Sequence, residues 1–507
     1  MLTRRDFLKV TAVGGAFASI GSMQQAKAAV RTALPDEAFA YEGGRKIPLV
    51  DETDIVVVGG SARAVAAAVA ASKNGCQVFL VCDLPYLGEE ICAAHLYERE
   101  EGEELRTVLA KRIFQAAPLP APMTVKKVLE DALIDNGVKF LYSSYATNVL
   151  VDDAGEAAGV VIANRSGREA IRCKAIIDAT HEAVVAGFLD AERTPFKPGE
   201  QDFDFTVVGN APKQAKEIVG VHPWKKELQV GAARYPVTRY TFRFPMRDNS
   251  YAALQEVEQR IRTSLWDADQ VDSSDRLWYI PKQNIVCKAH CGALDGSLRS
   301  LPLDAFTPKS AARIWILGPE AGLPRELAAR IIMRPVSAMW LGELLGEQIA
   351  GEVKGLALSQ NVQVKQVAAQ ASTYGVIGEH LQPLRPILNQ GWVESPASAL
   401  PVLGQYDVIV VGGGVAGASA GISAARQGAK TLVLEYLHGL GGLGTLGMIG
   451  VYWDGFRGGY SAMLDKGVLE MAPADHPRRP EKNDRFPADW KMEWLRKELL
   501  KEHPTHR

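Results

Sequence analysis

A strand–turn–helix–strand pattern occurs twice in this chain of 507 residues. Residues 55–58 and 408–411 are short runs of valine and isoleucine, which are typical of buried parallel strands. A glycine-containing turn, an alanine-rich stretch and a second apolar run follow each of them. Gly412 matches Gly59, so the two copies are offset by 353 residues. The sequence therefore predicts two related βαβ modules in one chain, matched over 55–82 and 408–435.

The second copy carries a complete dinucleotide-binding pattern. Gly412, Gly414 and Gly417 occupy the three positions of G-x-G-x-x-G, and Glu435 closes the following strand. The first glycine makes the tight turn, the second lets a pyrophosphate approach the backbone, and the third packs helix against strand. The acid is expected to bind a ribose hydroxyl. A lone G-x-G-x-x-G is weak evidence, but here the strand, the helix, the second strand and the acid all fall in register. We therefore expect this copy to bind a dinucleotide.

The first copy has the same outline with an altered turn. Gly59 and Gly60 are followed by Ser61, which stands at the middle glycine position, and Ala64 stands at the third. The acid is displaced by one position, to Asp83. Ser61 places a side chain where the pyrophosphate would approach the backbone. Nucleotide binding and a purely structural role are therefore equal alternatives for this turn.

Further motifs extend the match to a known family. Residues 175–180 read Ala-Ile-Ile-Asp-Ala-Thr, and residues 439–445 form the loop Gly-Leu-Gly-Gly-Leu-Gly-Thr. With the two modules, they resemble the FAD-dependent oxidoreductases whose relatives include the flavin subunit of heterodisulfide reductase, in a tandem-module form. The resemblance implies that the chain binds FAD rather than NAD. It also implies that Gly441, Gly442 and Thr445 lie against the flavin.

Two segments depart from the family pattern. His181 stands where the family has a glycine after Ala-Thr, which puts close contact with a flavin in doubt. Pro319 and Glu320 stand where family members place an aspartate near the ribityl chain. The iron–sulfur ligands of the heterodisulfide relatives are absent from the sequence.

The expected fold class is α/β. A Rossmann-like FAD/NAD(P)-binding module is expected over 51–355, with an inserted, mostly β substrate or cap domain at about 200–305. Residues 356–404 contain several prolines and are expected to be an extended linker. Residues 405–507 are expected to form a second, partial Rossmann-like unit. Because this unit is much shorter than the first, it is expected either to belong to a longer tandem protein or to complement the first module in space.

Residues 1–28 have the layout of a twin-arginine signal peptide. Residues 3–9 read Thr-Arg-Arg-Asp-Phe-Leu-Lys, a weakly apolar stretch follows, and Ala-Lys-Ala stands at 26–28. An amphipathic first helix is the alternative. The signal predicts export of an already folded protein to a periplasmic or other extracytoplasmic location.

Charge and composition exclude several partners. The formal net charge is −2 and no basic stripe occurs, so no nucleic-acid partner is expected. Beyond the N-terminus no apolar run is long enough to predict a membrane span once the signal is removed. Cys287 and Cys291 form a C-x3-C pair, which cannot hold an iron–sulfur cluster by itself, and no metal site is expected.

The sequence assigns no catalytic residue. His181, His222 and His290 are candidates because histidine titrates near neutral pH, although a lone histidine is more often structural. Tyr452 and Trp453 follow the glycine-rich loop and are expected either to line a flavin pocket or to fill the core.

Arg234, Arg239 and Arg243 alternate along one predicted strand, residues 233–246. They are interpreted either as an anion-binding face or as a solvated strand face.

Two hypotheses for the function follow. In the first, the chain is an FAD-dependent oxidoreductase that acts after export on an unknown small-molecule substrate. Nicotinamide cofactors are not expected outside the cytoplasm, so its electron acceptor is expected to be a quinone, a cytochrome or oxygen. In the second, the chain is a non-catalytic or degenerate nucleotide-binding module, or a fragment of a longer tandem flavoprotein. A yellow colour on purification distinguishes the first from the second.

Overall fold

A computed structural model describes residues 38–115, 119–292, 294, 297–368, 373–377, 391–452, 454–481 and 485–501. The predicted signal peptide and Trp453 lie outside the described residues. Within them, no helix is both long and apolar enough to cross a membrane.

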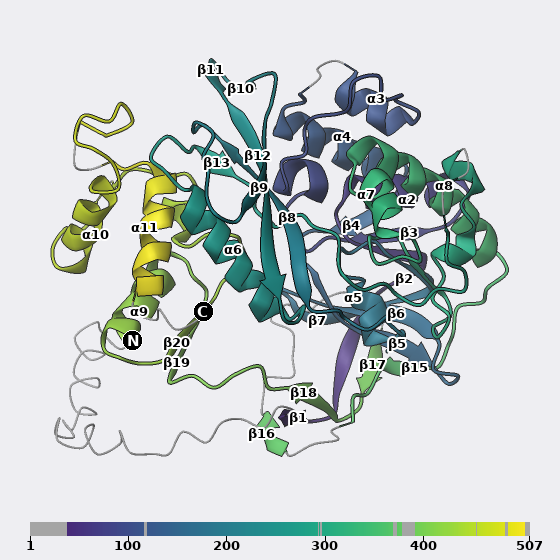
Figure 1. Cartoon of the computed structure of the whole chain (residues 1–507). Coiled ribbons are helices and arrows are strands. Elements are labelled where there is room, and N and C mark those ends of the chain that lie inside the picture. Colours follow the sequence, from purple (N-terminus) through teal and green to yellow (C-terminus); the bar gives the residue numbers. More distant parts are fainter. Residues whose placement is uncertain are drawn as a thin grey trace.

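A nine-stranded sheet forms the centre of the N-terminal module (Figure 1). Its order is β14-β7-β6-β5-β15-β17-β2-β3-β4, and β7 also pairs with β2, so the strands from β7 through β5 to β2 close a ring. The strands are β2 (Arg45–Val58), β3 (Val78–Val81), β4 (Lys139–Leu141), β5 (Tyr145–Asp152), β6 (Ala157–Asn164), β7 (Gly167–Asp178), β14 (Ile314–Ile316), β15 (Val362–Val364) and β17 (Trp392–Ser395).

Helices cover this sheet and bury the first repeat. They are α2 (Ala62–Lys73), the π-helical turn η2 (Glu89–Ala93), α3 (Val108–Phe114), α4 (Pro122–Asp135), α5 (Val184–Phe188), α7 (Arg325–Ile331) and α8 (Pro335–Val353). Residues 55–58 are buried because β2 lies between β3 and β7 and beneath α2. The valine-rich run thus forms a central parallel strand, as its composition predicts.

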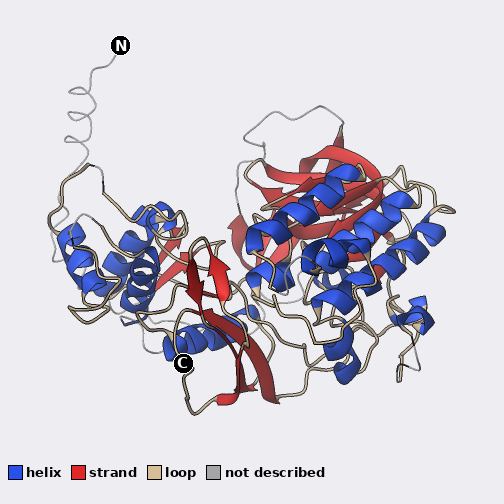
Figure 2. Cartoon of the chain, turned by 90° about the horizontal axis from the view of Figure 1, so that it is seen from above, coloured by secondary structure: helices blue, strands red, loops and turns tan. Residues whose placement is uncertain are grey.

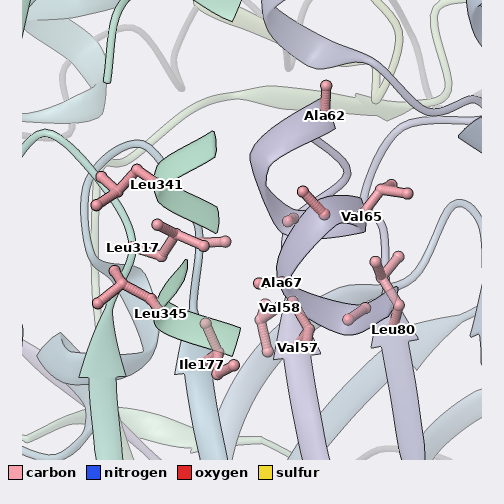
Figure 3. Packing of buried hydrophobic residues seen from close by; sticks show 14 of the residues in the cluster. Val57, Val58, Ala62, Val65, Ala67, Leu80, Ile177, Leu317, Leu341 and Leu345 are labelled. Carbon is pink, nitrogen blue, oxygen red and sulfur yellow. The ribbon is translucent and has the colours of Figure 1, made fainter. Parts of the chain in front are cut away.

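Helices α2 and α8 approach each other closely. A Cβ atom on Gly342 would collide with the carbonyl oxygen of Arg63, and one on Gly346 would collide with that of Ala67. The close approach gathers side chains of α2, α8 and the strand ends into one apolar core (Figure 3). These two glycines therefore lie on the packing face of α8.

The described parts of the segment 356–404, expected to be a linker, contain extended strands that belong to the sheets. β15 pairs with β5, and β17 pairs with the first half of β2. β18 (Ser398–Pro401) and β16 (Thr373–Ile377) flank β1 (Phe39–Glu42) in a separate three-stranded sheet. The extended backbone enters the sheet because its amide and carbonyl groups find partners on β5 and β2.

The insert is mostly β, as expected. Its four-stranded sheet has the order β13-β8-β12-β9, beside the hairpin β10–β11 and the helix α6 (Tyr251–Leu265). The strands are β8 (Gly199–Val208), β9 (Ile218–Pro223), β10 (Leu228–Val230), β11 (Ala233–Tyr235), β12 (Val237–Met246) and β13 (Asp272–Ser273). The predicted single strand 233–246 is wrong. Pro236, which has no amide hydrogen to donate, separates β11 from β12.

The described residues of the second unit form one parallel strand pair and three helices. These are β19 (Val408–Val411), β20 (Thr431–Leu434), α9 (Val415–Arg426), α10 (Tyr460–Leu469) and α11 (Ala488–Lys501), with the short turn η5 (Gly442–Gly444). Figures 1 and 2 show this unit beside the insert, on the side away from the nine-stranded sheet. The Trp490 indole donates to the Ala268 carbonyl at 3.0 Å, and Arg496 contacts Gln259 of α6. The α/β fold with an insert and a second partial unit is thus confirmed.

Candidate cofactor site

The two copies of the repeat have the same local geometry. In each copy the first strand pairs in parallel with the second, and the two registers match at the offset of 353 residues. The amide of Gly59 donates to the Val81 carbonyl at 2.8 Å, and the amide of Gly412 donates to the Leu434 carbonyl at 2.8 Å. The sequence repeat is therefore also a repeat of backbone structure.

A further hydrogen bond extends the repeat beyond the second strand. The amide of Gly88 donates to the Gly60 carbonyl at 2.7 Å, and the amide of Gly441 donates to the Gly413 carbonyl at 2.8 Å. The offset is again 353 residues. The glycine-rich loop of the second unit therefore has a structural counterpart in the first, which sequence reasoning missed because only one glycine of that loop recurs.

The glycine turn of the second unit is open. Gly412 has a φ of +96°, which favours glycine. A Cβ on Gly412 or on Gly414 would meet no described atom within 4 Å, whereas one on Gly417 would collide with the Gly412 carbonyl. Helix α9 starts at Val415 without a side-chain cap and without an acidic residue in its first turn. Space and unused backbone amides at a helix N-terminus fit a pyrophosphate.

The other predicted residues of the second unit gather around this turn. One carboxylate oxygen of Glu435 accepts a hydrogen bond from the Gly413 amide at 2.6 Å, which places the acid across the turn. A Cβ on Gly442 would lie 3.1 Å from the Gly414 Cα, so the loop lies against the turn. Thr445 is buried, and its hydroxyl donates to the Leu440 carbonyl at 2.7 Å. Thr445 therefore shapes the loop that carries Gly441 and Gly442.

The glycine turn of the first module is closed. Ser61 is fully buried, and its hydroxyl accepts a hydrogen bond from the Ala64 amide at 3.2 Å. A Cβ on Gly60 would collide with the Cys82 sulfur, which fills the turn from the other side. Both oxygens of the Glu90 carboxyl lie 3.0 Å from the Ala62 amide, the first of helix α2. The residues present therefore leave no room for a pyrophosphate at this turn.

A buried arginine accompanies Glu90. The Arg63 Nε donates to the Leu317 carbonyl at 2.9 Å, and Nη2 donates to the Ala179 carbonyl at 3.2 Å. Burial raises the pKa of the Glu90 carboxyl, and the nearby Arg63 charge opposes that rise. Sequence reasoning missed both residues. The offset of 353 residues could have found them. It matches the charged Arg63 and Glu90 of the first copy with the apolar Ala416 and Leu443 of the second.

Asp83, the displaced acid of the first copy, does not face the turn. Its carboxylate forms an ion pair with Arg276, whose guanidinium also contacts Glu89 at 2.8 Å. The pair ties the end of β3 to the insert. Asp83 therefore has a partner of its own in this fold.

The three candidate histidines lie apart in the fold. His181 is buried, its Nε2 lies 2.7 Å from the Tyr279 carbonyl oxygen, and burial lowers the pKa of the ring. His222 is exposed on β9, and His290 is exposed on a loop. The structure therefore does not bring the three into one site, and His181 packs in the core against Trp278.

A pair of carboxyl groups follows the ends of β7 and β14. Glu320 is buried and forms an ion pair with the Arg193 Nε at 3.0 Å. Burial, the largest effect, raises the pKa of Glu320 to about 7, while Arg193 opposes the rise. The Tyr279 hydroxyl donates to Glu182 at 2.8 Å. Glu182, Tyr279 and Glu320 line a cavity of about 20 Å³ with Gln201, which is room for roughly one water molecule.

The arginines of the insert do not share one strand. Arg234 is exposed in the hairpin β10–β11. Arg239 and Arg243 lie on β12, where Arg243 forms an exposed ion pair with Asp202 at 2.6 Å. Tyr452 is half-buried and contacts the Phe486 ring in the core of the second unit.

None of the six cysteines, all of which lie in the described part of the chain, forms a disulfide. Four are buried, whereas Cys287 and Cys291 are half-buried. Within the described residues no three histidine, cysteine or acidic side chains gather in a way that could hold a metal ion.

Comparison with known proteins identifies the matched segments. Residues 54–204 and 407–469, which contain the two copies of the repeat, match the sequence model of the family described as FAD dependent oxidoreductase. No curated protein matches the chain.

Three solved structures illustrate the fold similarity. One is an aromatic hydroxylase from angucycline biosynthesis, at 14% identity over 60% of this chain and 63% of that chain, with a TM-score of 0.36. Another is a flavin-dependent brominase, at 13% identity over 61% and 81%, with a TM-score of 0.36. A third is a geranylgeranyl bacteriochlorophyll reductase-like protein from Thermoplasma acidophilum, at 15% identity over 60% and 82%, with a TM-score of 0.36. The chain therefore spans less than two thirds of the hydroxylase.

Proposed function

We propose that this chain is a flavoprotein of the FAD-dependent oxidoreductase type, which works after export with its FAD on the second unit. The match of residues 54–204 and 407–469 to that family supports the proposal. The observation that carries the proposal is the open turn at Gly412 and Gly414, at the start of α9. The bound flavin would supply hydride or electron transfer to an unknown small-molecule substrate.

The chain's own residues contribute binding and orientation. The amides at the start of α9 carry partial positive charge that suits the two phosphates. The small size of Gly414 lets the phosphates approach the backbone. Glu435, already held across the turn by the Gly413 amide, offers a carboxylate to the ribose hydroxyls.

Export is supported by the sequence pattern of residues 1–28. The twin-arginine route moves folded proteins, which suits a chain that takes up FAD in the cytoplasm. A quinone, a cytochrome or oxygen is the proposed electron acceptor. The glycine-rich loop at 439–445 and the tandem modules support the proposed kinship with the flavin subunit of heterodisulfide reductase.

A degenerate nucleotide-binding module is the second candidate function. The closed turn around Ser61 and Glu90 favours it for the N-terminal module. In that case the chain would fold without holding a flavin.

The deciding measurement is the visible absorbance spectrum of the chain expressed with its N-terminal segment and purified. The proposal predicts a flavin spectrum, with FAD rather than FMN released on denaturation. A folded but colourless protein would refute the oxidoreductase and support the second candidate. Export is tested separately by replacing Arg4 and Arg5 with lysine, which should keep the chain in the cytoplasm.

A further inference from the structure

We propose that the first glycine turn is a dinucleotide site closed by the protein itself, with the Glu90 carboxyl in the place of the ligand's diphosphate. The N-terminal module then serves as a platform for the insert and the second unit. The chain as a whole would bind one FAD, and this count rests on the proposed function.

The two glycine turns are equivalent in backbone structure. The same amide–carbonyl bonds hold both turns, from Gly59 and Gly412 to the second strand and from Gly88 and Gly441 to the turn. A residue of one copy can therefore be compared with its counterpart by position. The backbones agree, so any difference in ligand binding must come from the side chains.

The side chains that surround the expected diphosphate position differ between the two copies at each matched position. Glu90 is fully buried against the first amide of α2, whereas its counterpart Leu443 is 67% exposed and leaves the start of α9 uncovered. Ser61 caps α2 where Gly414 leaves α9 without a side-chain cap. An anion site at a helix N-terminus attracts a carboxyl for the reason that it attracts a phosphate. Glu90 therefore satisfies the amide that a dinucleotide would otherwise bind.

Arg63 strengthens the closure. Its guanidinium is buried near Glu90 and binds the carbonyls of Ala179 and Leu317, which follow β7 and β14. The counterpart of Arg63 in the second unit is Ala416. The nearby Arg63 charge favours the ionised form of Glu90. Withdrawal of Glu90 would leave the buried first amide of α2 without its hydrogen-bond acceptor, which is unfavourable. The closed turn is therefore a stable arrangement and not an empty site awaiting a ligand.

The test compares substitutions at the matched positions Ser61 and Gly414. A Cβ at Gly414 meets no described atom within 4 Å, so the turn has room for a side chain at its start, and Gly414→Val fills the pyrophosphate space. Ser61→Val places the same side chain in the closed turn. FAD per chain is measured from the absorbance of the released flavin, and thermal unfolding reports whether each variant is folded. We expect about one FAD per parent chain, at least tenfold less in Gly414→Val, and no change beyond twofold in Ser61→Val.

The outcomes separate this inference from the proposed function. Two FAD per chain, retention of FAD in Gly414→Val, or its loss from a folded Ser61→Val would overturn the closure while leaving the flavoprotein assignment in place. A folded parent chain without flavin would refute the proposed function and agree with a closed first turn. Should Ser61→Val fail to fold, Glu90→Gln replaces it. This variant keeps the shape of the carboxyl, and its FAD content should equal that of the parent; a flavin bound at this turn would instead bind more tightly once the acid is gone.

Discussion

The Nδ1 atom of His438 lies 3.3 Å from the carboxylate of Asp275, and this contact joins the second unit to the insert. Asp275 is the last of three aspartates spaced three residues apart, at 269, 272 and 275, around the short strand β13. Each of the three carboxylates contacts a histidine from elsewhere in the chain. The other two pairs are His476 with Asp269 at 3.1 Å and His95 with Asp272 at 3.2 Å.

Acidification should lower the stability of the fold through the buried ring of His438. Burial lowers the pKa of this ring below its usual value of 6.5, although Asp275 opposes the shift. Below pH 6.5 the unfolded chain therefore binds a proton that the folded chain resists, so the free energy of unfolding falls as the pH falls. Other charged groups near the ring are Arg262, Asp272 and Glu258. We expect His438→Gln to lose less stability than the parent between about pH 7 and pH 5, measured by urea unfolding. The exposed His222→Gln should behave as the parent does, and equal losses in all three proteins would contradict the prediction.

Glu320 should produce the opposite pH dependence. Burial raises the pKa of Glu320 from 4.5 to about 7, so between these values the folded chain holds a proton that the unfolded chain has released. This contribution to stability is complete below pH 4.5 and is lost as the pH rises through about 7. At roughly 1.4 kcal/mol per pKa unit the loss amounts to about 3 kcal/mol.

The measurement is the change in unfolding free energy of the parent between pH 5 and pH 8, compared with that of Glu320→Gln. The amide does not titrate, so the variant should lack this part of the slope. Glu326→Gln, on the exposed surface of α7, serves as the control and should keep the parent slope. Identical slopes in the parent and in Glu320→Gln would show that the carboxyl titrates normally.

The contact between α2 and α8 depends on glycine at two positions of α8, and the prediction concerns Gly346. A Cβ on Gly346 would collide with the Ala67 carbonyl, so Gly346→Ala must push the two helices apart. We expect a loss of about 1–3 kcal/mol in unfolding free energy. Gly351 lies on the same helix with no described atom within 4 Å of its Cβ position, so Gly351→Ala should stabilise the chain by about 0.5–1 kcal/mol. The pair is compared by denaturant unfolding, and a stable Gly346→Ala would argue against this packing.

Thiol labelling should divide the cysteines by burial. Cys287 and Cys291 are half-buried, whereas the other four are buried. A neutral maleimide should modify two thiols in the folded chain and all six after denaturation, as counted by mass spectrometry. Burial raises the pKa of Cys287 to about 11, so its reaction should be slow at neutral pH. Rapid labelling of Cys82 or Cys173 in the folded protein would show that the N-terminal core opens.

Local sequence patterns predicted the elements of the fold that depend on residues close together in the chain. The valine runs at 55–58 and 408–411 predict buried parallel strands, and each lies beside the strand that follows it along the chain. Burial is confirmed for 55–58 but is wrong for 408–411, where Ile409 and Val411 are exposed. The glycines of α8 mark its packing face because only glycine, which has no side chain, lets α2 approach so closely. The linker strands β15 and β17 were missed because their partners lie far away in the sequence.

One of the two glycine turns could be predicted from the sequence, and the other could not. The open turn at Gly412–Gly417 follows from residue size and spacing, which a sequence displays directly. The closed turn depends on Glu90, which the chain brings back to the start of α2 only through the turn that follows β3. The glutamate alone carries no sign of that role.

By itself, the sequence determined that two βαβ modules are present, which glycine turn is complete, and the family of cofactor. These properties depend on short-range order, because strand, turn and helix follow one another within a few residues. Only the tertiary structure decided which turn remains open. Burial of Glu90 against the start of α2 and of Arg63 against the ends of β7 and β14 closes the first turn. The corresponding Ala416 and Leu443 leave the second turn accessible. A carboxyl group takes the place of a phosphate only when folding brings it to the helix N-terminus and excludes water around it.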